Sequence, residues 1–278
     1  MTAARLVFGT YDVPDRALLD RFYAGGGRAL DVANVYCDGE SSRAAGAWLR
    51  TAPDDVVVYA KGCHPPNCSP ALVAAEVDRA RRLLDRDRLD VFLLHRDDPS
   101  LPVAAWADAL LEQQRAGRIG GFGVSNWTVA RLLELRRHLG ADRPLVLSNH
   151  FSLAELVTPP WPGCLALSRA ELQSLAGLGV TVITWSSLGT GFFAGRDVPS
   201  WDSAVNRERR ERARELAARL GTTPAAVALA YVLHQPPHVL AAVGTRSRAH
   251  LEEALAAARL ELSPDQLAWL EQGARVYN

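Results

Sequence analysis

Four side chains of the types that transfer and hold protons stand at or just beyond the ends of three successive apolar segments. They are Asp31, Tyr36, Lys61 and His95. A carboxylate, a phenol, an amine and an imidazole that lie close together change one another's proton affinities. The set therefore predicts an acid–base site, provided that the fold brings the three segments together.

Taken singly, each of these residues has a structural explanation. Asp31 could cap a turn, Tyr36 and Lys61 could be ordinary loop residues, and His95 could be a hydrogen-bonded histidine at a strand end. In a parallel α/β sheet or barrel, however, all strand C-termini open on one face. Residues that follow successive strands would meet on that face, so the four together favour function over structure.

The elements that must position these residues can be read from the hydrophobic periodicity, which alternates between strand-like and helical segments along the chain. The strand-like segments are 5–9, 29–33, 56–60, 90–95, 121–125, 145–149, 180–185 and 239–243. The helical segments are 14–24, 42–50, 69–84, 102–116, 128–139, 168–177, 207–220, 224–234, 248–258 and 264–273. Eight strands that alternate with helices predict a closed (β/α)8 TIM barrel, a single domain over residues 1–278.

The composition suits a globular enzyme and limits its partners. The length of 278 residues is normal for one α/β barrel, and 31 Lys plus Arg balance 31 Asp plus Glu. Such a balance creates no long-range field that would favour nucleic acid or an acidic membrane as a partner. The sequence has no apolar run of transmembrane length and no signal-peptide pattern, so we expect a cytoplasmic protein.

The cysteines offer a metal site as an alternative. Cys63, His64 and Cys68 are close in sequence, but no second pair of Cys or His ligands follows them. We therefore expect no metal, and reduced thiols rather than disulfides. The glycine run 25–27 lies between a helix and a strand, and neither a Rossmann nor a P-loop glycine pattern occurs.

Several ordered motifs carry a resemblance to a known family. They are residues 30–36 (LDVANVY), 59–62 (YAKG), 89–95 (LDVFLLH) and 116–126 (AGRIGGFGVSN). In this order they resemble motifs of the aldo-keto reductases, and the resemblance covers nearly the whole chain. It implies the reduction of an aldehyde or ketone to an alcohol, with NADP(H) as the cofactor and a small-molecule carbonyl compound as the substrate.

The resemblance also implies roles for the four residues. Tyr36 would protonate the developing alkoxide while the nicotinamide gives hydride to the carbonyl carbon. The pKa of a free phenol is roughly 10, and a nearby Lys61 ammonium would lower it. Asp31 would hold Lys61 charged and oriented, and a neutral His95 would hydrogen-bond the substrate oxygen.

By the same resemblance, the second half of the chain would bind NADP(H). Ser125 and Asn126 would bind the carboxamide, and Trp185 would stack on the nicotinamide ring. The stretch 185–196 resembles a pyrophosphate loop, although a generic strand-to-helix turn would look similar. The full set of expected cofactor residues is Gly9, Thr10, Ser125, Asn126, His150, Trp185, Ser186, Leu188, Gly189, Gly191, Arg196, Gly244, Thr245, Arg246, His250 and Glu253.

The adenosine end of the cofactor would lie at segment 243–247, which opens a helix whose N-terminal N–H groups favour an anion. Arg246 would contact a 2′-phosphate and so favour NADP(H), unless it is simply a surface arginine. The sequence departs from the family pattern at His150, where the family often has Gln, and at Ala254, where it has an Asn that contacts adenine. The N-terminal sequence also lacks the residues that usually form a hairpin closing the barrel bottom in this family, so we expect no such hairpin.

The substrate is poorly defined by the sequence. Tyr11 and Trp127 are expected to wall a pocket, whereas Phe151, Trp161 and Phe192 are candidates for the core. One alternative function is an NADP(H)-binding regulatory subunit with slow turnover, as in the potassium-channel β subunits. Another is a metal-dependent barrel hydrolase or lyase that uses Asp31, His64 and His95.

Overall fold

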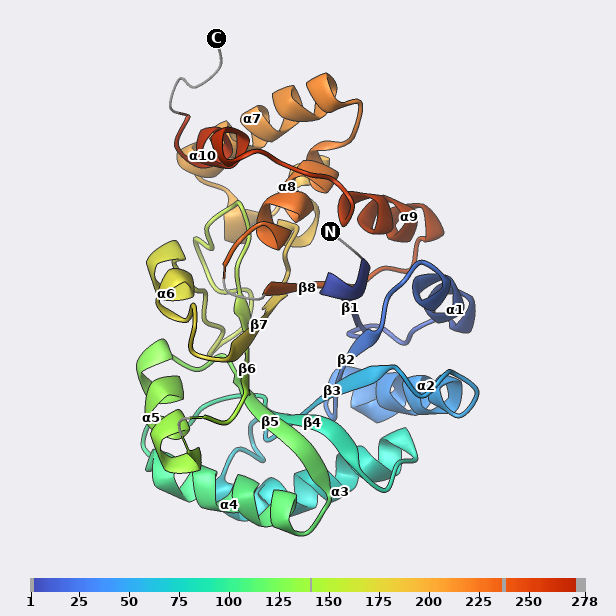
Figure 1. Cartoon of the computed structure of the whole chain (residues 1–278), viewed down its shortest axis with the longest axis vertical. Coiled ribbons are helices and arrows are strands. Elements are labelled where there is room, and N and C mark those ends of the chain that lie inside the picture. Colours follow the sequence, from blue (N-terminus) through green and yellow to red (C-terminus); the bar gives the residue numbers. More distant parts are fainter. Residues whose placement is uncertain (1–2, 141, 237–238, 274–278) are drawn as a thin grey trace.

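The strands expected from the sequence form a closed parallel barrel. The computed structural model describes residues 3–140, 142–236 and 239–273. The strands pair in chain order, and β1 closes the ring by pairing with β8 (Figure 1). They are β1 (Leu6–Gly9), β2 (Ala29–Ala33), β3 (Val57–Gly62), β4 (Leu89–Leu94), β5 (Ile119–Ser125), β6 (Leu145–His150), β7 (Val180–Trp185) and β8 (Val239–Val243). The predicted (β/α)8 barrel is thereby confirmed.

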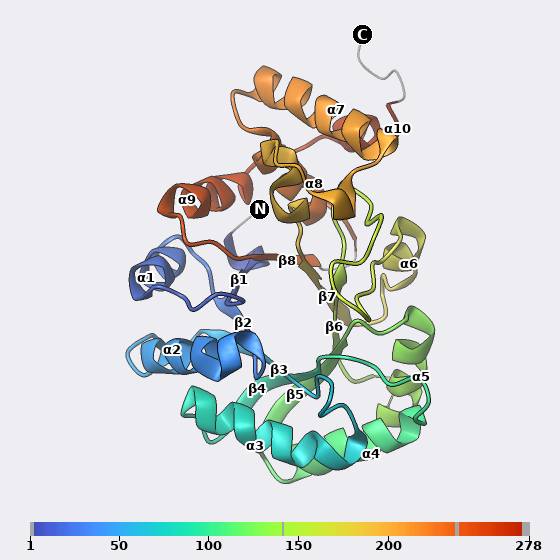
Figure 2. The ribbon, with the colours of Figure 1, turned by 180° about the vertical axis from the view of Figure 1, so that it is seen from behind.

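Helices surround the barrel, as Figures 1 and 2 show from opposite sides. The α-helices are α1 (Arg16–Ala24), α2 (Glu40–Leu49), α3 (Val73–Leu84), α4 (Val103–Arg115), α5 (Val129–Leu139), α6 (Arg169–Ser174), α7 (Ala204–Leu220), α8 (Pro224–Leu233), α9 (Arg248–Ala257) and α10 (Pro264–Gln272). Short 3-10 helices lie in the connections: η1 (Ala3–Arg5), η2 (Tyr36–Gly39), η3 (Pro70–Leu72), η4 (Gly189–Ala194) and η5 (Pro199–Trp201).

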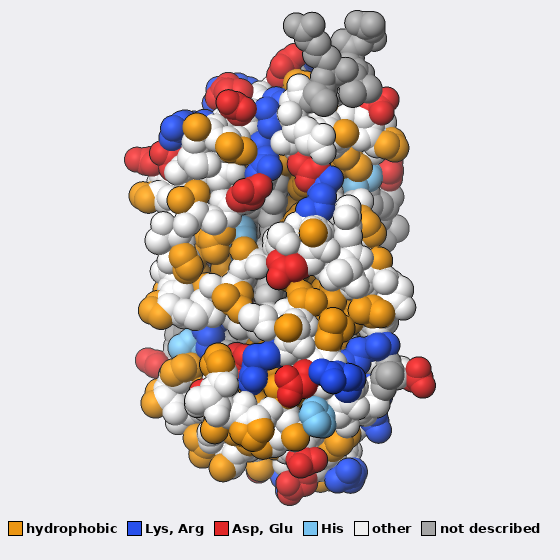
Figure 3. Space-filling model, turned by 90° about the vertical axis from the view of Figure 1, so that its left-hand side faces the viewer, with side chains coloured by type: hydrophobic (Ala, Val, Ile, Leu, Met, Phe, Trp, Pro, Cys, Tyr) orange, Lys and Arg blue, Asp and Glu red, His pale blue; other side chains and the backbone are white. Residues whose placement is uncertain are grey.

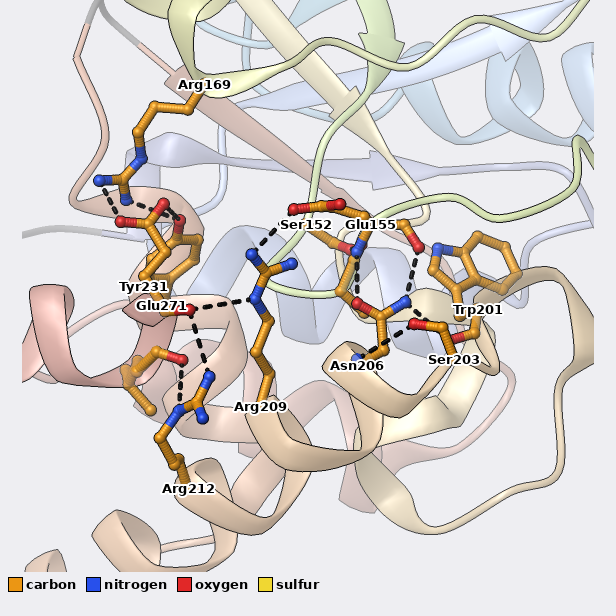
Figure 4. A network of polar contacts seen from close by, with 12 residues as sticks. Ser152, Glu155, Arg169, Trp201, Ser203, Asn206, Arg209, Arg212, Tyr231 and Glu271 are labelled. Atoms are coloured by element: carbon orange, nitrogen blue, oxygen red, sulfur yellow. Dashed lines mark hydrogen bonds and ion pairs between the residues drawn. The ribbon is translucent and has the colours of Figure 1, made fainter. Parts of the chain in front are cut away.

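A polar network holds α10 against α7 at one end of the molecule (Figure 4). The guanidinium of Arg212 donates to the backbone carbonyls of Leu270 at 3.0 Å and Glu271 at 3.2 Å. The carboxylate of Glu271 pairs with Arg169 and accepts a hydrogen bond from the hydroxyl of Tyr231 at 2.8 Å. The network therefore joins α6, α7, α8 and α10.

Side-chain alternation along the strands decides which residues point into the barrel. A small apolar cluster draws one residue from each of six strands: Val7, Ala29, Leu93, Val146, Ile183 and Leu240. It is separate from the larger core, which includes the buried residues of the surrounding helices. Residues two positions further along a strand point to the same side, so Asp31, His95 and Trp185 face the mouth of the barrel.

Most elements differ from the prediction at one end or both, and two of these differences have a clear local cause. β5 begins at Ile119, two residues before its predicted start. The hydrophobic pattern missed this start because the residues after Ile119 are glycines, which give no hydrophobic signal. A Cβ added at Gly120 would lie 2.8 Å from the carbonyl oxygen of Asp90, so close pairing with β4 requires glycine there. α7 begins at Ala204, three residues before its predicted start, because the side chain of Ser203 caps the helix.

Acidic and basic side chains are interspersed on the face shown in Figure 3. Within the described ranges, no single helix is long and apolar enough to span a membrane. Only α7 and α8 taken as a pair reach that length and composition, with a bend of 100° between them. The domain limits and the missing N-terminal hairpin involve residues outside the described ranges, so both stay predictions.

Candidate active site

An ion pair lies at the mouth of the barrel, where β2 and β3 run side by side. The Nζ atom of Lys61 is 2.6 Å from Oδ1 of Asp31 and 2.7 Å from Oδ2. The two side chains are only 2% and 5% exposed, so water screens the pair weakly. Burial acts to lower the pKa of Lys61, but Asp31 and Tyr36 together raise it above its usual value. The ammonium form therefore persists at neutral pH.

Tyr36 comes back to this ion pair from the turn after β2. It begins η2, in which Cys37 and Asp38 adopt left-handed backbone conformations with φ of 46° and 52°. The turn places the phenol oxygen 3.1 Å from Nζ of Lys61, which donates a hydrogen bond to it. Burial raises the pKa of Tyr36, and the charge of Lys61 only partly opposes that rise.

Lys61 lowers the pKa of the phenol, as expected, but the net pKa of Tyr36 lies above its ordinary value rather than below it. The physical reason is the burial of Tyr36, which disfavours the charged phenolate more than the ammonium favours it. The phenol thus holds its proton at neutral pH, and Lys61 limits how far its pKa rises.

His95 completes the group from the end of β4. Its backbone N–H donates to the carbonyl of Gly62 at 2.7 Å, and its ring lies 5.7 Å from the ring of Tyr36 at an angle of 85°. Burial lowers the pKa of His95 well below its ordinary value, and the charges of Lys61 and Arg96 add to this. The imidazole is therefore neutral, and the structure brings all four predicted side chains together.

Two buried residues that the sequence analysis missed fix the turns after β2 and β3. The amide of Asn34 donates to a carboxylate oxygen of Glu76 at 2.9 Å, and the backbone N–H of Cys63 donates to the same oxygen at 3.1 Å. Glu76 lies on the buried stripe of α3, among apolar residues at helical spacing. The sequence signal for the role of Glu76 in holding these turns was the presence of a charged residue among the apolar positions of a helix.

Across the barrel mouth, Ser125 and Asn126 are buried at the end of β5. The hydroxyl of Ser125 donates to the carbonyl of Ser148 at 2.9 Å and accepts from the amide of Asn126 at 3.0 Å. The carbonyl oxygen of the Asn126 side chain accepts from the backbone N–H of Leu165 at 3.1 Å. Ser125 therefore ties β5 to β6 and to Asn126, and Asn126 also holds the loop after β6 in place.

His150, another predicted cofactor ligand, is buried in the structure. Its ring lies 5.0 Å from that of Trp185, but both ring nitrogens are already hydrogen-bonded. Nδ1 donates to the carbonyl of Trp185 at 3.0 Å, and Nε2 accepts the indole N–H of Trp201 at 3.2 Å. Burial lowers the pKa of His150 to about 4. The histidine thus anchors the loop after β7, and its ring nitrogens are not free to take the place of a glutamine amide.

The predicted pyrophosphate loop is a tight turn after β7. Ser186, Gly189 and Gly191 have positive φ, and Leu188 is half-buried just before η4. A Cβ added at Gly191 would lie 2.5 Å from Cδ of Arg196, so glycine allows the loop to fold back on itself. Arg196 is exposed and lines a surface hollow beside the loop.

The ends of β1 and β8 approach each other closely beside the acid–base group. A Cβ added at Gly244 would lie 2.9 Å from the carbonyl oxygen of Gly9. The hydroxyl of Thr10 is buried and donates to the backbone carbonyl of Asp31 at 3.0 Å. Thr10 thus fixes the strand that carries the carboxylate.

The segment after β8 leads into the N-terminus of α9. Of the predicted residues there, Thr245 is half-buried, His250 is exposed and Arg246 has a side chain that is 74% exposed. Glu253 accepts a hydrogen bond from the hydroxyl of Thr223, which caps α8. The structure therefore places Glu253 at the contact between two helices rather than free in solvent.

Two exposed aromatic rings lie in a row beside Tyr36, with Tyr11 against Tyr36 and Trp161 against Tyr11. The ring of Tyr11, 58% exposed, lies 5.4 Å from that of Tyr36, and Trp161, 47% exposed, lies 5.8 Å from Tyr11. Trp127, in contrast, is fully buried, and its indole N–H donates to the carbonyl of Arg96 at 3.3 Å. The prediction of Trp127 as a pocket wall is therefore wrong, and Trp161, a candidate for the core, lies at the mouth instead.

Among the residues that the structure describes, no three His, Cys, Asp or Glu side chains are grouped so that they could hold a metal ion. Cys63 is buried, and burial raises the pKa of its thiol. The ring of His64 lies 5.0 Å from that of His95, whereas Asp31 is engaged by Lys61. The alternative of a metal-dependent hydrolase has no structural support here.

Comparisons with known proteins agree with the motifs. The model of the Aldo/keto reductase family matches residues 6–274. The chain is 25% identical to a norsolorinic acid reductase of Emericella nidulans, over 92% of this chain and 70% of that protein. It is 30% identical to an uncharacterized oxidoreductase of Mycobacterium bovis, over 94% of this chain and 82% of that protein.

Solved structures show the same fold at lower identity. The thermostable aldo-keto reductase Tm1743, in complex with the inhibitor epalrestat, superposes with a TM-score of 0.78 at 21% identity, covering 96% of this chain and 94% of that one. The aldo/keto reductase of Klebsiella pneumoniae, in complex with NADP and acetate, gives a TM-score of 0.74 at 23% identity, covering 96% and 89%. The match of the family model over nearly the whole sequence confirms the resemblance, and the chain belongs to the Aldo/keto reductase family of oxidoreductases.

Proposed function

We propose that this enzyme uses NADP(H) to reduce an aldehyde or ketone to an alcohol, with Tyr36 as the proton donor. The observation that carries the proposal is the position of Nζ of Lys61, between the carboxylate of Asp31 and the hydroxyl of Tyr36. Such an arrangement suits a phenol that must give up a proton and exist briefly as phenolate. A protein that only binds a ligand would not need a buried ammonium beside a phenol.

The groups around the other half of the barrel mouth fit a dinucleotide. The indole N–H of Trp185 has no partner within the described ranges, although it is shielded from water. The glycine turn at Gly189 and Gly191 allows close approach of a pyrophosphate, and Arg246 at the N-terminus of α9 suits a phosphate. The Klebsiella relative was crystallised with NADP, which supports the same cofactor here. When bound, the reduced nicotinamide supplies the hydride.

The proton step follows from the charges of the acid–base group. Because burial raises its pKa, Tyr36 enters the reaction as a neutral phenol and can donate its proton to the developing alkoxide. The phenolate that remains is stabilised by the Lys61 ammonium, 3.1 Å away, and Tyr36 then regains a proton from solvent. Proton transfer of this kind typically contributes about 10²–10⁴-fold in rate.

His95 would bind and orient the carbonyl oxygen. Its low pKa keeps the imidazole neutral, so it can donate a hydrogen bond without placing a second cation beside Lys61. A donor aimed at the oxygen stabilises the negative charge that develops there. Tyr11 would shield one side of the same oxygen from water, because its ring lies against that of Tyr36, and Trp161 would extend this aromatic surface from Tyr11.

The test combines cofactor binding with product analysis. Fluorescence titration should give a lower Kd for NADPH than for NADH, and a panel of aldehydes, ketones and sugar-derived carbonyls should contain compounds reduced to one alcohol per NADPH oxidised. Tight binding of NADPH without turnover of any compound would favour the regulatory-subunit alternative. Failure to bind either cofactor would overturn the proposal.

A further inference from the structure

A second buried cation lies beside the acid–base group. Arg96 directly follows His95 and is only 9% exposed. Its guanidinium donates to the carbonyl of His95 at 3.1 Å and to Sγ of Cys164 at 3.5 Å. A guanidinium has five N–H donors, and a thiol is a weak acceptor. These two contacts therefore leave most of the N–H donors of the Arg96 guanidinium available to other acceptors.

The neighbouring carboxylates do not neutralise this charge. Asp97 is paired with Arg131 at 2.6 Å, and Asp98 accepts a hydrogen bond from the hydroxyl of Ser100 at 2.6 Å. Within the described ranges, no carboxylate oxygen lies within ion-pair distance of the guanidinium of Arg96. A buried cation without an anion is costly, so such a site attracts one.

The rest of the acid–base group contributes no net charge that could balance Arg96. The charges of Asp31 and Lys61 cancel, and the low pKa of His95 keeps that ring neutral. The positive charge of Arg96 is felt at the reacting groups, since it helps to lower the pKa of His95 and opposes the rise in the pKa of Tyr36. The guanidinium also lies 3.1 Å from the backbone carbonyl of His95, which places its charge beside the acid–base group.

The loop after β6 contacts Arg96 and also carries one of the two exposed aromatic rings. A Cβ added at Gly163 would lie 3.6 Å from Cδ of Arg96, and Cys164 contacts the guanidinium itself. The same short loop carries Trp161, whose ring lies 5.8 Å from that of Tyr11. The loop that contacts Arg96 thus also carries a ring of the exposed aromatic pair, and the other ring of that pair lies against the proton donor.

We propose that Arg96 binds a carboxylate of the substrate, so that the preferred substrates are carbonyl compounds that also carry a carboxylate group. This inference rests on the proposed reductase function and adds a substrate class to it. The carboxylate would replace Cys164 as an acceptor for the guanidinium and would form charge-assisted hydrogen bonds, which are about twice as strong as neutral ones. Arg96 is then a specificity-determining residue rather than part of the proton-transfer group.

The kinetic test compares 4-carboxybenzaldehyde with its methyl ester, in which the carboxylate charge is replaced by a neutral ester. It uses the ratio of the two kcat/KM values within each enzyme. Wild type should prefer the acid by at least about 10-fold, as expected for a hydrogen bond to a charged group. Arg96→Met should remove the preference, mainly through KM, and Arg96→Lys should restore part of it. Preference for the ester in wild type, or an unchanged ratio in Arg96→Met, would overturn the proposal.

Arg115→Met is the matched control, since it removes the same charge from the exposed last turn of α4. It should keep the ratio of the wild-type enzyme. If Arg115→Met abolished the preference as well, overall charge rather than a site at Arg96 would explain it.

A binding measurement separates this inference from the proposed function. Calorimetry in the presence of NADP+ compares 4-(hydroxymethyl)benzoate with its methyl ester, and neither compound requires reduction. Wild type should bind the carboxylate about 10-fold more tightly than the ester, and Arg96→Met should bind both alike. If neither aldehyde is reduced but the carboxylate still binds through Arg96, the proposed function fails and the anion site stands. Equal binding of the two compounds to wild type contradicts the anion site.

Discussion

The indole N–H of Trp201 donates a hydrogen bond to Nε2 of His150, with 3.2 Å between the two nitrogens. Because an indole can only donate, His150 must carry its own proton on Nδ1, which donates to the carbonyl of Trp185. Asn206 ties Trp201 to the loop after β6, since its amide donates to the carbonyls of Glu155 at 2.7 Å and Trp201 at 2.8 Å (Figure 4). The connection after β7, which includes the predicted pyrophosphate loop, is thus fastened to β6 and to the loop that follows it.

Removing the Trp201 donor should weaken cofactor binding more than it slows the reaction. In Trp201→Phe the ring of residue 201 stays apolar but Nε2 of His150 loses its donor, at a cost of roughly 1–3 kcal/mol. We expect the Kd for NADPH, measured by fluorescence titration, to rise several-fold while kcat changes less. Trp106→Phe is the control, because Trp106 is equally buried and its indole N–H has no partner within the described ranges. Equal effects of the two substitutions on Kd would show that the contact with His150 does not position the loop.

Stability should depend on pH through His150. Its folded-state pKa of about 4 lies below the unfolded value of about 6.5, so the unfolded chain binds the proton first as pH falls. The stabilisation is fully present above pH ~6.5 and is lost between about 6.5 and 4, by roughly 3 kcal/mol in total. Urea unfolding of His150→Gln should show a shallower loss over this window than wild type. The exposed His138→Gln should match wild type, and parallel curves for all three proteins would disprove the assignment.

Substitutions at the buried pair of Asp31 and Lys61 should affect the free energy of unfolding and the activity differently. Asp31→Asn leaves Lys61 buried without its partner, which typically costs 3–5 kcal/mol. The double variant Asp31→Asn/Lys61→Met removes both charges and should regain much of the unfolding free energy. Both variants should lose carbonyl reduction. Asp31→Asn leaves Lys61 without the carboxylate that holds it in place, and the double variant removes the amine that donates to Tyr36. Recovery of activity in the double variant would show that the cation is dispensable.

Arg246 should set the preference between cofactors. It is exposed at the N-terminus of α9, and its only ion pair within the described ranges is a long contact of 3.7 Å with Asp12, so it is available to a 2′-phosphate. Arg246→Ala should raise the Kd for NADPH by about 10-fold or less, the range of one exposed charge contact, and leave that for NADH nearly unchanged. Arg248→Ala removes an equally exposed arginine one position beyond the cap. If both substitutions weaken the two cofactors alike, Arg246 does not read the 2′-phosphate.

The parts of this structure that the sequence predicted well are those set by local periodicity. Alternation along β2 and β4 predicts that Asp31 and His95 share one side, and the barrel brings those sides together. The ion pair of Asp31 with Lys61 follows from neighbouring strands alone. None of this required knowledge of distant contacts.

The predictions that were wrong depend on tertiary packing. The sequence does not show which of Trp127 and Trp161 is buried. Trp127 follows a left-handed turn at Asn126, with φ of 58°, and its indole packs inside the protein, whereas the side chain of Trp161 is exposed. The acidity of Tyr36 depends on how deeply its phenol is buried, which spacing does not show. The partner of His150 lies fifty-one residues away, in a loop with no periodicity.

The most direct test of the account compares Tyr36→Phe with wild type under single-turnover conditions, in which preformed enzyme–NADPH complex is mixed with an aldehyde that the wild type reduces. The hydride step should slow by about 10²–10⁴-fold, the range of proton-transfer catalysis, while the Kd for NADPH stays within about threefold of wild type. Reduction at close to the wild-type rate would contradict the assignment of Tyr36 as the proton donor.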